Sequence, residues 1–207
     1  MRTRIKICGI TSTRDGLAAA HAGADAIGLV FYAPSPRAIT AERAAEIASA
    51  LPPFVTRVGL FVNPAPGEVE SVLARCPLDL LQFHGDETPE QCAHYGKPFL
   101  KAFRVRQGVD LVESAAPYKA AAGWLLDAYR ADVYGGSGEA FDWGLIPAGL
   151  DRPIVLSGGL DPGNVGDAIR RVRPWAVDVS SGVEASKGVK DAARIAAFIA
   201  GVRNADV

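Results

Sequence analysis

Short apolar runs alternate with amphipathic, alanine-rich stretches along the whole chain. The runs are nearly continuous in Val, Ile, Leu and Phe, which is typical of strands covered on both faces. The runs that predict strands are Arg4–Cys8, Ala26–Phe31, Val58–Val62, Leu80–Phe83, Phe99–Phe103, Trp124–Asp127, Ile154–Leu156 and Ala176–Val179. Helical patterns follow them at Thr13–Ala22, Ala41–Leu51, Pro66–Ala74, Pro89–His94, near Val109–Ala115, near Asp142–Ala148, at Pro162–Arg171 and at Val189–Val202.

This regular alternation of strands and helices indicates parallel strands joined by right-handed crossovers. Eight such units in 207 residues give about 26 residues per unit, near the lower end for a (β/α)₈ barrel. We therefore predict an α/β fold, a parallel eight-stranded (β/α)₈ TIM barrel that forms a single domain over residues 1–207. The alternative is a doubly wound open sheet, which would typically use about five or six strands and leave the last two units unexplained.

Polar residues mark the starts of several predicted helices. Ser12 or Thr13 can cap the first helix and Thr40 the second, because a side-chain oxygen at this position accepts from a free backbone N–H. Asp161 followed by Pro162 predicts a further helix start, since proline in the first helical position sacrifices no hydrogen bond.

Composition and charge limit the possible partners. Hydrophobic residues make up 49% of the chain and charged residues 22%, as in ordinary water-soluble domains. The 22 Lys and Arg residues nearly balance the 23 Asp and Glu residues, so no overall field favours nucleic acid or an acidic membrane surface. No run approaches the ~18 apolar residues of a membrane span, and the N-terminal segment lacks the apolar region of a signal peptide.

Cysteine usage indicates a reducing compartment. Cys8, Cys76 and Cys92 are an odd number of cysteines with no Cys-x-x-Cys pair, which argues against a disulfide framework or a structural zinc site. We therefore expect a cytoplasmic protein. A monomer is the default expectation, because no distinct apolar patch can be identified in the sequence.

Glycine and serine follow the last two predicted strands, at the end of the barrel where active sites of this fold lie. Gly158 and Gly159 follow the seventh strand, and Ser180, Ser181 and Gly182 follow the eighth. Backbone N–H groups and hydroxyls in such loops can bind phosphate, and glycine lets the backbone approach it closely. Glycine would also serve a simple tight turn, but two such loops on consecutive strands favour a phosphate site.

Cys8 and Asp127 are candidates for proton transfer. Buried cysteines are mostly small hydrophobic residues, but Cys8 ends the first strand, where a thiolate could remove a carbon-bound proton if a cation lowered its pKa. Asp127 ends the sixth strand, and desolvation there would suit it to act as a general acid. The alternative for Asp127 is an ion pair with Lys101 or Arg130.

Three further side chains are candidates for substrate binding. Arg37, in the loop after the second strand, could hold a carboxylate with two parallel hydrogen bonds, or it could be an ordinary surface arginine. Gln82 and His84 lie at the end of the fourth strand, where His84 could line the pocket as an accessory residue or simply close the strand.

The opening segment Lys6-Ile7-Cys8-Gly9-Ile10 resembles that of the phosphoribosylanthranilate isomerase family of tryptophan biosynthesis. The match continues in order along essentially the whole chain, although the phosphate loops are shared by many barrels. The matching segments are Gly28-Leu29-Val30-Phe31, Ser35-Pro36-Arg37, Val58-Gly59-Leu60-Phe61-Val62, Leu81-Gln82-Phe83-His84-Gly85, Gly135-Gly136-Ser137-Gly138, Phe141-Asp142-Trp143, Ser157-Gly158-Gly159-Leu160 and Asp178-Val179-Ser180-Ser181-Gly182-Val183-Glu184.

The resemblance implies an Amadori rearrangement of N-(5-phosphoribosyl)anthranilate to 1-(2-carboxyphenylamino)-1-deoxyribulose 5-phosphate, without cofactor or metal. It implies that Cys8 is the general base, that Asp127 is the general acid and that Arg37 holds the anthranilate carboxylate. The substrate is therefore a small molecule that carries a phosphate and a carboxylate. The remaining residues expected to bind it are Gln82, His84, Gly158, Gly159, Asp178, Ser180, Ser181 and Gly182.

Related phosphate-binding barrels are the nearest alternatives. The histidine-pathway isomerase performs the same type of rearrangement but typically has a carboxylate where Cys8 stands, and it is a longer chain, as is indole-glycerol-phosphate synthase. A catalytically silent phosphate-binding barrel is the alternative from another class. The presence of both Cys8 and Asp127 argues against it.

Overall fold

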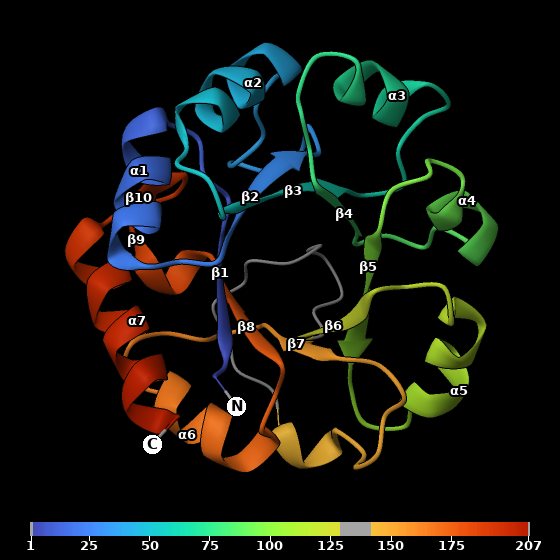
Figure 1. The fold of residues 1–207 in the computed structure, drawn as a ribbon. Coiled ribbons are helices and arrows are strands. Elements are labelled where there is room, and N and C mark those ends of the chain that lie inside the picture. Colours follow the sequence, from blue (N-terminus) through green and yellow to red (C-terminus); the bar gives the residue numbers. More distant parts are fainter. Residues whose placement is uncertain (1, 129–141, 207) are drawn as a thin grey trace.

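The strands of the protein close into a barrel in sequence order, and helices surround it (Figure 1). The structure, a computed structural model, describes residues 2–128 and 142–206. Every neighbouring pair in the barrel is parallel, and β1 closes the ring by pairing with β8 from Arg4↔Ala176 to Ile7↔Val179. The (β/α)₈ prediction is confirmed. The open-sheet alternative is excluded, because β1 and β8 pair with each other and the sheet has no edge strand.

The observed elements follow the predicted order closely. The barrel strands are β1 Arg4–Cys8, β2 Ala26–Phe31, β3 Thr56–Phe61, β4 Leu80–Phe83, β5 Phe99–Val105, β6 Gly123–Ala128, β7 Ile154–Leu156 and β8 Ala176–Val179. The α-helices are α1 Thr13–Ala22, α2 Ala41–Ala50, α3 Glu68–Leu73, α4 Pro89–Ala93, α5 Leu111–Ala115, α6 Val165–Val172 and α7 Ala192–Ala205. Short 3₁₀ helices occur at η1 Ala116–Tyr118, η2 Trp143–Leu145 and η3 Ser181–Val183, and β9 Glu184–Ser186 pairs with β10 Val189–Lys190.

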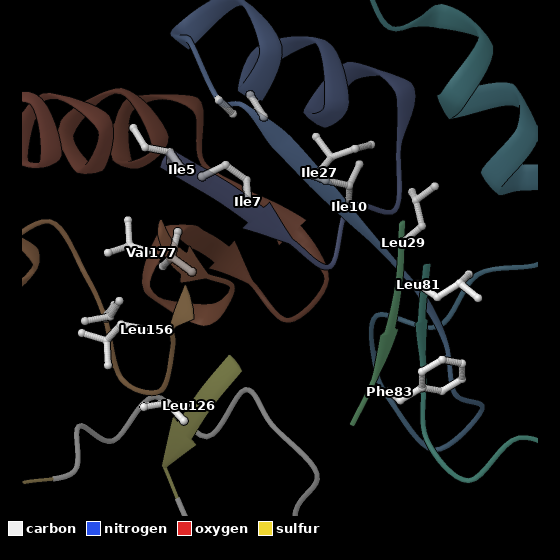
Figure 2. Packing of buried hydrophobic residues seen from close by; sticks show 14 of the residues in the cluster. Ile5, Ile7, Ile10, Ile27, Leu29, Leu81, Phe83, Leu126, Leu156 and Val177 are labelled. Carbon is white, nitrogen blue, oxygen red and sulfur yellow. The ribbon is translucent and has the colours of Figure 1, made fainter. Parts of the chain in front are cut away.

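Alternate side chains on each strand serve two different layers, because successive residues of a strand point to opposite faces. Outward residues such as Ile5, Ile7 and Leu81 are fully buried in the main core beneath the helices, part of which is shown in Figure 2. Inward residues form smaller apolar clusters, one around Leu100 and Leu125 and another that includes Cys8, Val30 and Leu60. The inward side chains nearest the C-terminal ends of the strands thus share the interior of the barrel.

Helix starts confirm two of the predicted caps and correct a third. Ser12 accepts from the backbone N–H of Asp15 at the start of α1, and Thr40 caps α2 in the same way. The start predicted at Asp161-Pro162 is wrong, because α6 begins at Val165. The Asp161 carboxylate instead accepts from the backbone N–H groups of Gly163 and Asn164, which closes a turn in front of the helix.

Two other predicted helices are shorter than expected. The pattern near Asp142–Ala148 gives only the 3₁₀ turn η2, with Asp142 as its cap. The helix predicted from Val189 begins at Ala192, because Val189–Lys190 pair with the preceding strand β9 and Asp191 caps α7 by accepting from two backbone N–H groups. The hairpin before α7 went unrecognised because its two strands are three and two residues long, too short for a periodic pattern.

Candidate active site

Cys8 lies at the mouth of the barrel, as the last residue of β1, with only 6% of its surface exposed. Burial raises the pKa of its thiol, and the positive charge of the Lys6 ammonium on the same strand opposes that rise. Cys76 and Cys92 are also buried, with thiol pKa values raised to about 11 and about 12. Cys8 is therefore the cysteine at the barrel mouth with a cation beside its sulfur.

Lys6 and Asp178 form a buried ion pair inside the barrel. The Lys6 Nζ lies 3.0 Å from Asp178 Oδ1, and each side chain is 5% exposed. Burial alone would lower the pKa of Lys6, but Asp178 and Cys8 reverse this effect and raise it, so Lys6 stays charged. Asp178, which we expected to bind substrate, thus has a lysine of the neighbouring strand as its partner.

Asp127 faces the barrel interior from the end of β6 and contacts His84. His84 Nε2 lies 3.0 Å from Asp127 Oδ2, and Gln82 Nε2 lies 3.1 Å from His84 Nδ1, so these three buried side chains form one chain of hydrogen bonds. Lys101 does not pair with Asp127, because it points out of the barrel and donates to Glu87 at 2.8 Å. Arg130, the other proposed partner, lies outside the described residues.

Arg37 is a buried residue and not a surface arginine. Its Nε and Nη2 donate to the two carboxylate oxygens of Glu184 at 2.7 and 2.8 Å, and Lys190 donates to the same carboxylate at 2.9 Å. Burial would raise the pKa of Glu184, but Arg37 and Lys190 together lower it. The Nη1 group of Arg37 has no role in this pair, so the guanidinium can still donate to an anion from that side.

The two glycine and serine loops meet at the barrel mouth. A Cβ on Gly182 would overlap the Leu160 carbonyl of the preceding loop, so the loops lie directly against each other. Gly158 and Gly159 have φ values of +82° and +66°, which favour glycine. Ser181 opens the 3₁₀ helix η3, and the first N–H groups of a helix have no partner within it.

The backbone N–H groups needed for an anion are available in both loops. Within residues 2–128 and 142–206, the hydrogen bonds leave the N–H groups of Gly158, Gly159, Ser181 and Gly182 without a partner. Ser180 has a different role, because its hydroxyl donates to the Cys8 carbonyl at 3.1 Å and Lys190 donates to its carbonyl. This arrangement can bind a phosphate on the side of the barrel that carries β7 and β8.

The structure brings the expected site residues into two groups at one end of the barrel. Cys8, Arg37, Asp178 and Ser180 lie on the wall made by β1, β2 and β8. Asp127, His84, Gln82 and Gly158 lie on the wall made by β4, β6 and β7, where a Cβ on Gly158 would be 2.8 Å from Asp127 Oδ1. The matching segment Gly135-Gly136-Ser137-Gly138 lies outside the described residues.

Sequence reasoning missed Lys6, Glu184 and Lys190. A signal for Lys6 was present, because a lysine two positions before Cys8 on a strand shares its inward face. Glu184 and Lys190 gave no comparable signal, since the contacts of Glu184 with Arg37 and with Lys190 depend on the hairpin β9–β10 folding back toward the barrel mouth.

The whole chain matches one enzyme family. The model of the N-(5′-phosphoribosyl)anthranilate (PRA) isomerase family matches residues 5–201. The chain belongs to this family. The N-(5′-phosphoribosyl)anthranilate isomerase of Pseudomonas aeruginosa strain UCBPP-PA14 is 62% identical over 201 residues, which are 97% of this chain and 95% of that protein.

Solved structures agree with this assignment. The phosphoribosylanthranilate isomerase of Thermotoga maritima has a TM-score of 0.90 and 44% identity, with 98% of this chain and 99% of that chain covered. Another isomerase structure (TM-score 0.85, 43% identity, coverage 98% and 99%) is a complex with reduced 1-(o-carboxyphenylamino)-1-deoxyribulose 5-phosphate. A third (TM-score 0.85, 42% identity, coverage 97% and 98%) is of monomers generated from the dimeric Thermotoga maritima isomerase. The resemblance inferred from the sequence motifs is confirmed.

Proposed function

We propose that this protein catalyses the Amadori rearrangement of N-(5-phosphoribosyl)anthranilate to 1-(2-carboxyphenylamino)-1-deoxyribulose 5-phosphate in tryptophan biosynthesis. It is an isomerase that acts by general acid and base catalysis. The observation that carries the proposal is the presence of Cys8 and Asp127 on facing walls of one barrel mouth, beside two loops with free N–H groups. Family membership over residues 5–201 supports the same reaction.

Asp127 is the group that we propose to open the ribose ring. Its carboxylic acid gives a proton to the ring oxygen as the bond from that oxygen to C1 breaks, and the anthranilate nitrogen forms a double bond to C1. The contact of Asp127 with His84 at 3.0 Å supports this role, because the imidazole can hold the carboxyl group in a fixed orientation. Because the amide nitrogen of Gln82 can only donate, His84 accepts at Nδ1 and donates from Nε2 to Asp127 Oδ2.

Cys8 is the group that we propose to remove the proton from C2. The positive imine nitrogen at C1 acidifies this proton, and its removal by the thiolate leaves an enolamine. Return of one proton to C1 and loss of one from the 2-hydroxyl then give the ketone, so the reaction is a net isomerisation. Each positioned proton-transfer group typically contributes about 10²–10⁴-fold in rate.

The two ends of the substrate have separate binding groups in this proposal. The N–H groups of Gly158, Gly159, Ser181 and Gly182 bind the phosphate, and Arg37 binds the anthranilate carboxylate. The Arg37 side chain is held rigidly by Glu184, which supports its use as a fixed anchor. Gln82 and His84 act through Asp127, since their hydrogen bonds form a chain that ends at its carboxylate.

The decisive experiment is turnover of phosphoribosylanthranilate generated in situ, followed as the loss of its fluorescence. We expect the pure protein to turn over this substrate with neither cofactor nor metal added. The control is the Cys8→Ala, Asp127→Asn double variant, purified in the same way to exclude a contaminating isomerase. Absence of turnover by the folded protein would disprove the assignment.

Three expectations about the state of the protein stay predictions. No helix within residues 2–128 and 142–206 combines the length and apolar character needed to cross a membrane, and a cytoplasmic location is proposed from cysteine usage. The absence of a resident metal or cofactor is proposed from the chemistry. A monomer was expected because the sequence shows no distinct apolar patch, but the side chain of Phe54 is fully exposed, which weakens that argument. Sedimentation of the pure protein at several concentrations tests whether it is a monomer.

A further inference from the structure

Lys6 is an unusual residue for the inside of a barrel strand. It lies between the outward residues Ile5 and Ile7, so its own side chain points into the barrel, and only 4% of its surface is exposed. Burying an ammonium group costs several kcal/mol unless partners compensate it. Hydrophobic packing does not explain why a lysine occupies this buried position, so Lys6 must have another role.

The ammonium of Lys6 is held by a carboxylate and shares the space beside Gly28 with the Cys8 sulfur. It donates to Asp178 Oδ1 at 3.0 Å, and its positive charge acts on the thiol of Cys8. A Cβ built on Gly28 of the neighbouring strand would lie 2.6 Å from Cys8 Sγ and 3.1 Å from Lys6 Nζ. The missing side chain of Gly28 thus leaves the space in which the lysine and cysteine side chains meet.

Other charged groups around Cys8 are engaged elsewhere. Lys190 and Arg37 also interact with Cys8 through their charge, but both are hydrogen-bonded to Glu184. Lys190 also donates to the carbonyl of Ser180, and Asp15 accepts from its backbone N–H. Among the cations of residues 2–128 and 142–206, Lys6 has the largest effect on the Cys8 thiol through its charge.

We propose that Lys6 is a positioning residue that keeps Cys8 available as a thiolate, and that Asp178 acts by holding Lys6 and not by binding substrate. A positive charge close to a sulfur stabilises the thiolate over the thiol, whereas burial does the opposite. Asp178 fixes the ammonium in place and, through its own charge, limits how far the thiolate is stabilised. This inference rests on the proposed role of Cys8 as the base.

The pKa of the Cys8 thiol in the substrate-free protein tests the proposal directly. It is measured as the pH dependence of the ultraviolet absorbance of the thiolate, with Cys8→Ser protein as the blank for Cys76 and Cys92. We expect Lys6→Met to raise this pKa by about one to three units and Lys6→Arg to restore most of the difference. Asp178→Asn keeps an acceptor for the lysine but removes the opposing charge, so the pKa falls.

Activity gives the second measurement. At neutral pH each unit of increase in the thiol pKa removes about nine-tenths of the thiolate, so kcat/KM of Lys6→Met falls about tenfold per unit and recovers as the pH is raised. A purely structural role would lower activity at every pH. Because the thiol pKa is measured without substrate, its result stands even if the enzyme assay shows no turnover.

Folding of the variants is controlled by a double substitution. If Lys6→Met leaves Asp178 uncompensated and unfolds, the Lys6→Met, Asp178→Asn protein removes both charges together. We still expect a thiol pKa above that of the unchanged protein, because Lys6 affects Cys8 more strongly than Asp178 does. A folded variant without Lys6 whose thiol pKa is unchanged or lower would overturn the proposal, as would Asp178→Asn raising KM with no shift in that pKa.

Discussion

Asp127 and Arg37 have in common that each is fixed by another side chain before substrate arrives. His84 holds the Asp127 carboxyl group at 3.0 Å, and Glu184 holds the Arg37 guanidinium with two hydrogen bonds. Fixing a reactive group in advance reduces the entropy lost on forming the transition state. At the residue scale, the site therefore depends on pairs of side chains more than on single ones.

Replacement of Asp127 by Asn keeps the shape of the side chain but removes its acid function. We expect kcat to fall by about 10²–10⁴-fold, while binding of a reduced product analogue changes little. Steady-state kinetics and analogue titration measure the two effects separately. The matched control is Asp86→Asn, an exposed residue two positions beyond His84. A near-normal kcat for the Asp127 variant would rule out the acid role.

Replacement of Arg37 by Ala should weaken substrate binding. Loss of a hydrogen bond between charged groups costs about 1.5–3 kcal/mol, so we expect KM or analogue affinity to worsen by about ten- to hundredfold. Arg43→Ala, which removes a half-exposed arginine of the same region, serves as the control. If neither KM nor analogue affinity changes, Arg37 is not the carboxylate anchor.

At the scale of elements, the loops after β7 and β8 depend on glycines at specific positions. Gly158 has a positive φ and lies beside Asp127, and the region of Gly182 packs on the carbonyl of Leu160. Each loop is thus fitted to the other and to the end of β6. A change in one loop therefore affects both the predicted phosphate site and the general acid.

The Gly158→Ala variant tests this connection. The added methyl group would lie 2.8 Å from Asp127 Oδ1 and 2.9 Å from Ala128 Cβ, so we expect kcat to fall and KM to rise together. Gly96→Ala is the control, because Gly96 also has a positive φ, +62°, but no atom lies within 4 Å of the added group. Kinetics that are alike for both variants would show that only backbone strain matters.

At the scale of the whole molecule, the hairpin β9–β10 carries a carboxylate that both holds Arg37 and makes the stability of the folded protein depend on pH. Glu184 on β9 is buried between Arg37 and Lys190, whose hydrogen bonds and charges overcome the effect of burial and lower its pKa. A carboxylate with a lowered pKa stabilises the folded state above its unfolded pKa, and this contribution is lost as the pH falls through the folded value.

Chemical denaturation at several pH values tests this dependence. We expect the Glu184→Gln protein to be less stable than the unchanged protein at neutral pH. The difference in unfolding free energy should shrink below about pH 4, which is near the pKa of a glutamate in the unfolded chain. Glu46→Gln is the control, because Glu46 forms an exposed ion pair on α2. A difference that stays constant with pH would contradict the prediction.

The eight strands and their order were determined by the sequence alone, because buried parallel strands give continuous apolar runs that can be identified locally. The ends of β1, β6, β7 and β8 were also correct to within one residue. Those ends carry Cys8, Asp127 and the two glycine and serine loops, so most of the candidate site could be predicted. That residues 1–207 form a single domain stays a prediction.

Only the tertiary structure decided what each site residue is paired with. Lys6 and Asp178 are 172 residues apart in the sequence and 3.0 Å apart in the barrel, and Arg37 meets Glu184 across 147 residues. The helix start expected at Asp161 failed for a related reason, because the same carboxylate can cap a helix or close a turn. A buried charge is stable only beside its partner, and closure of the barrel brings those partners together.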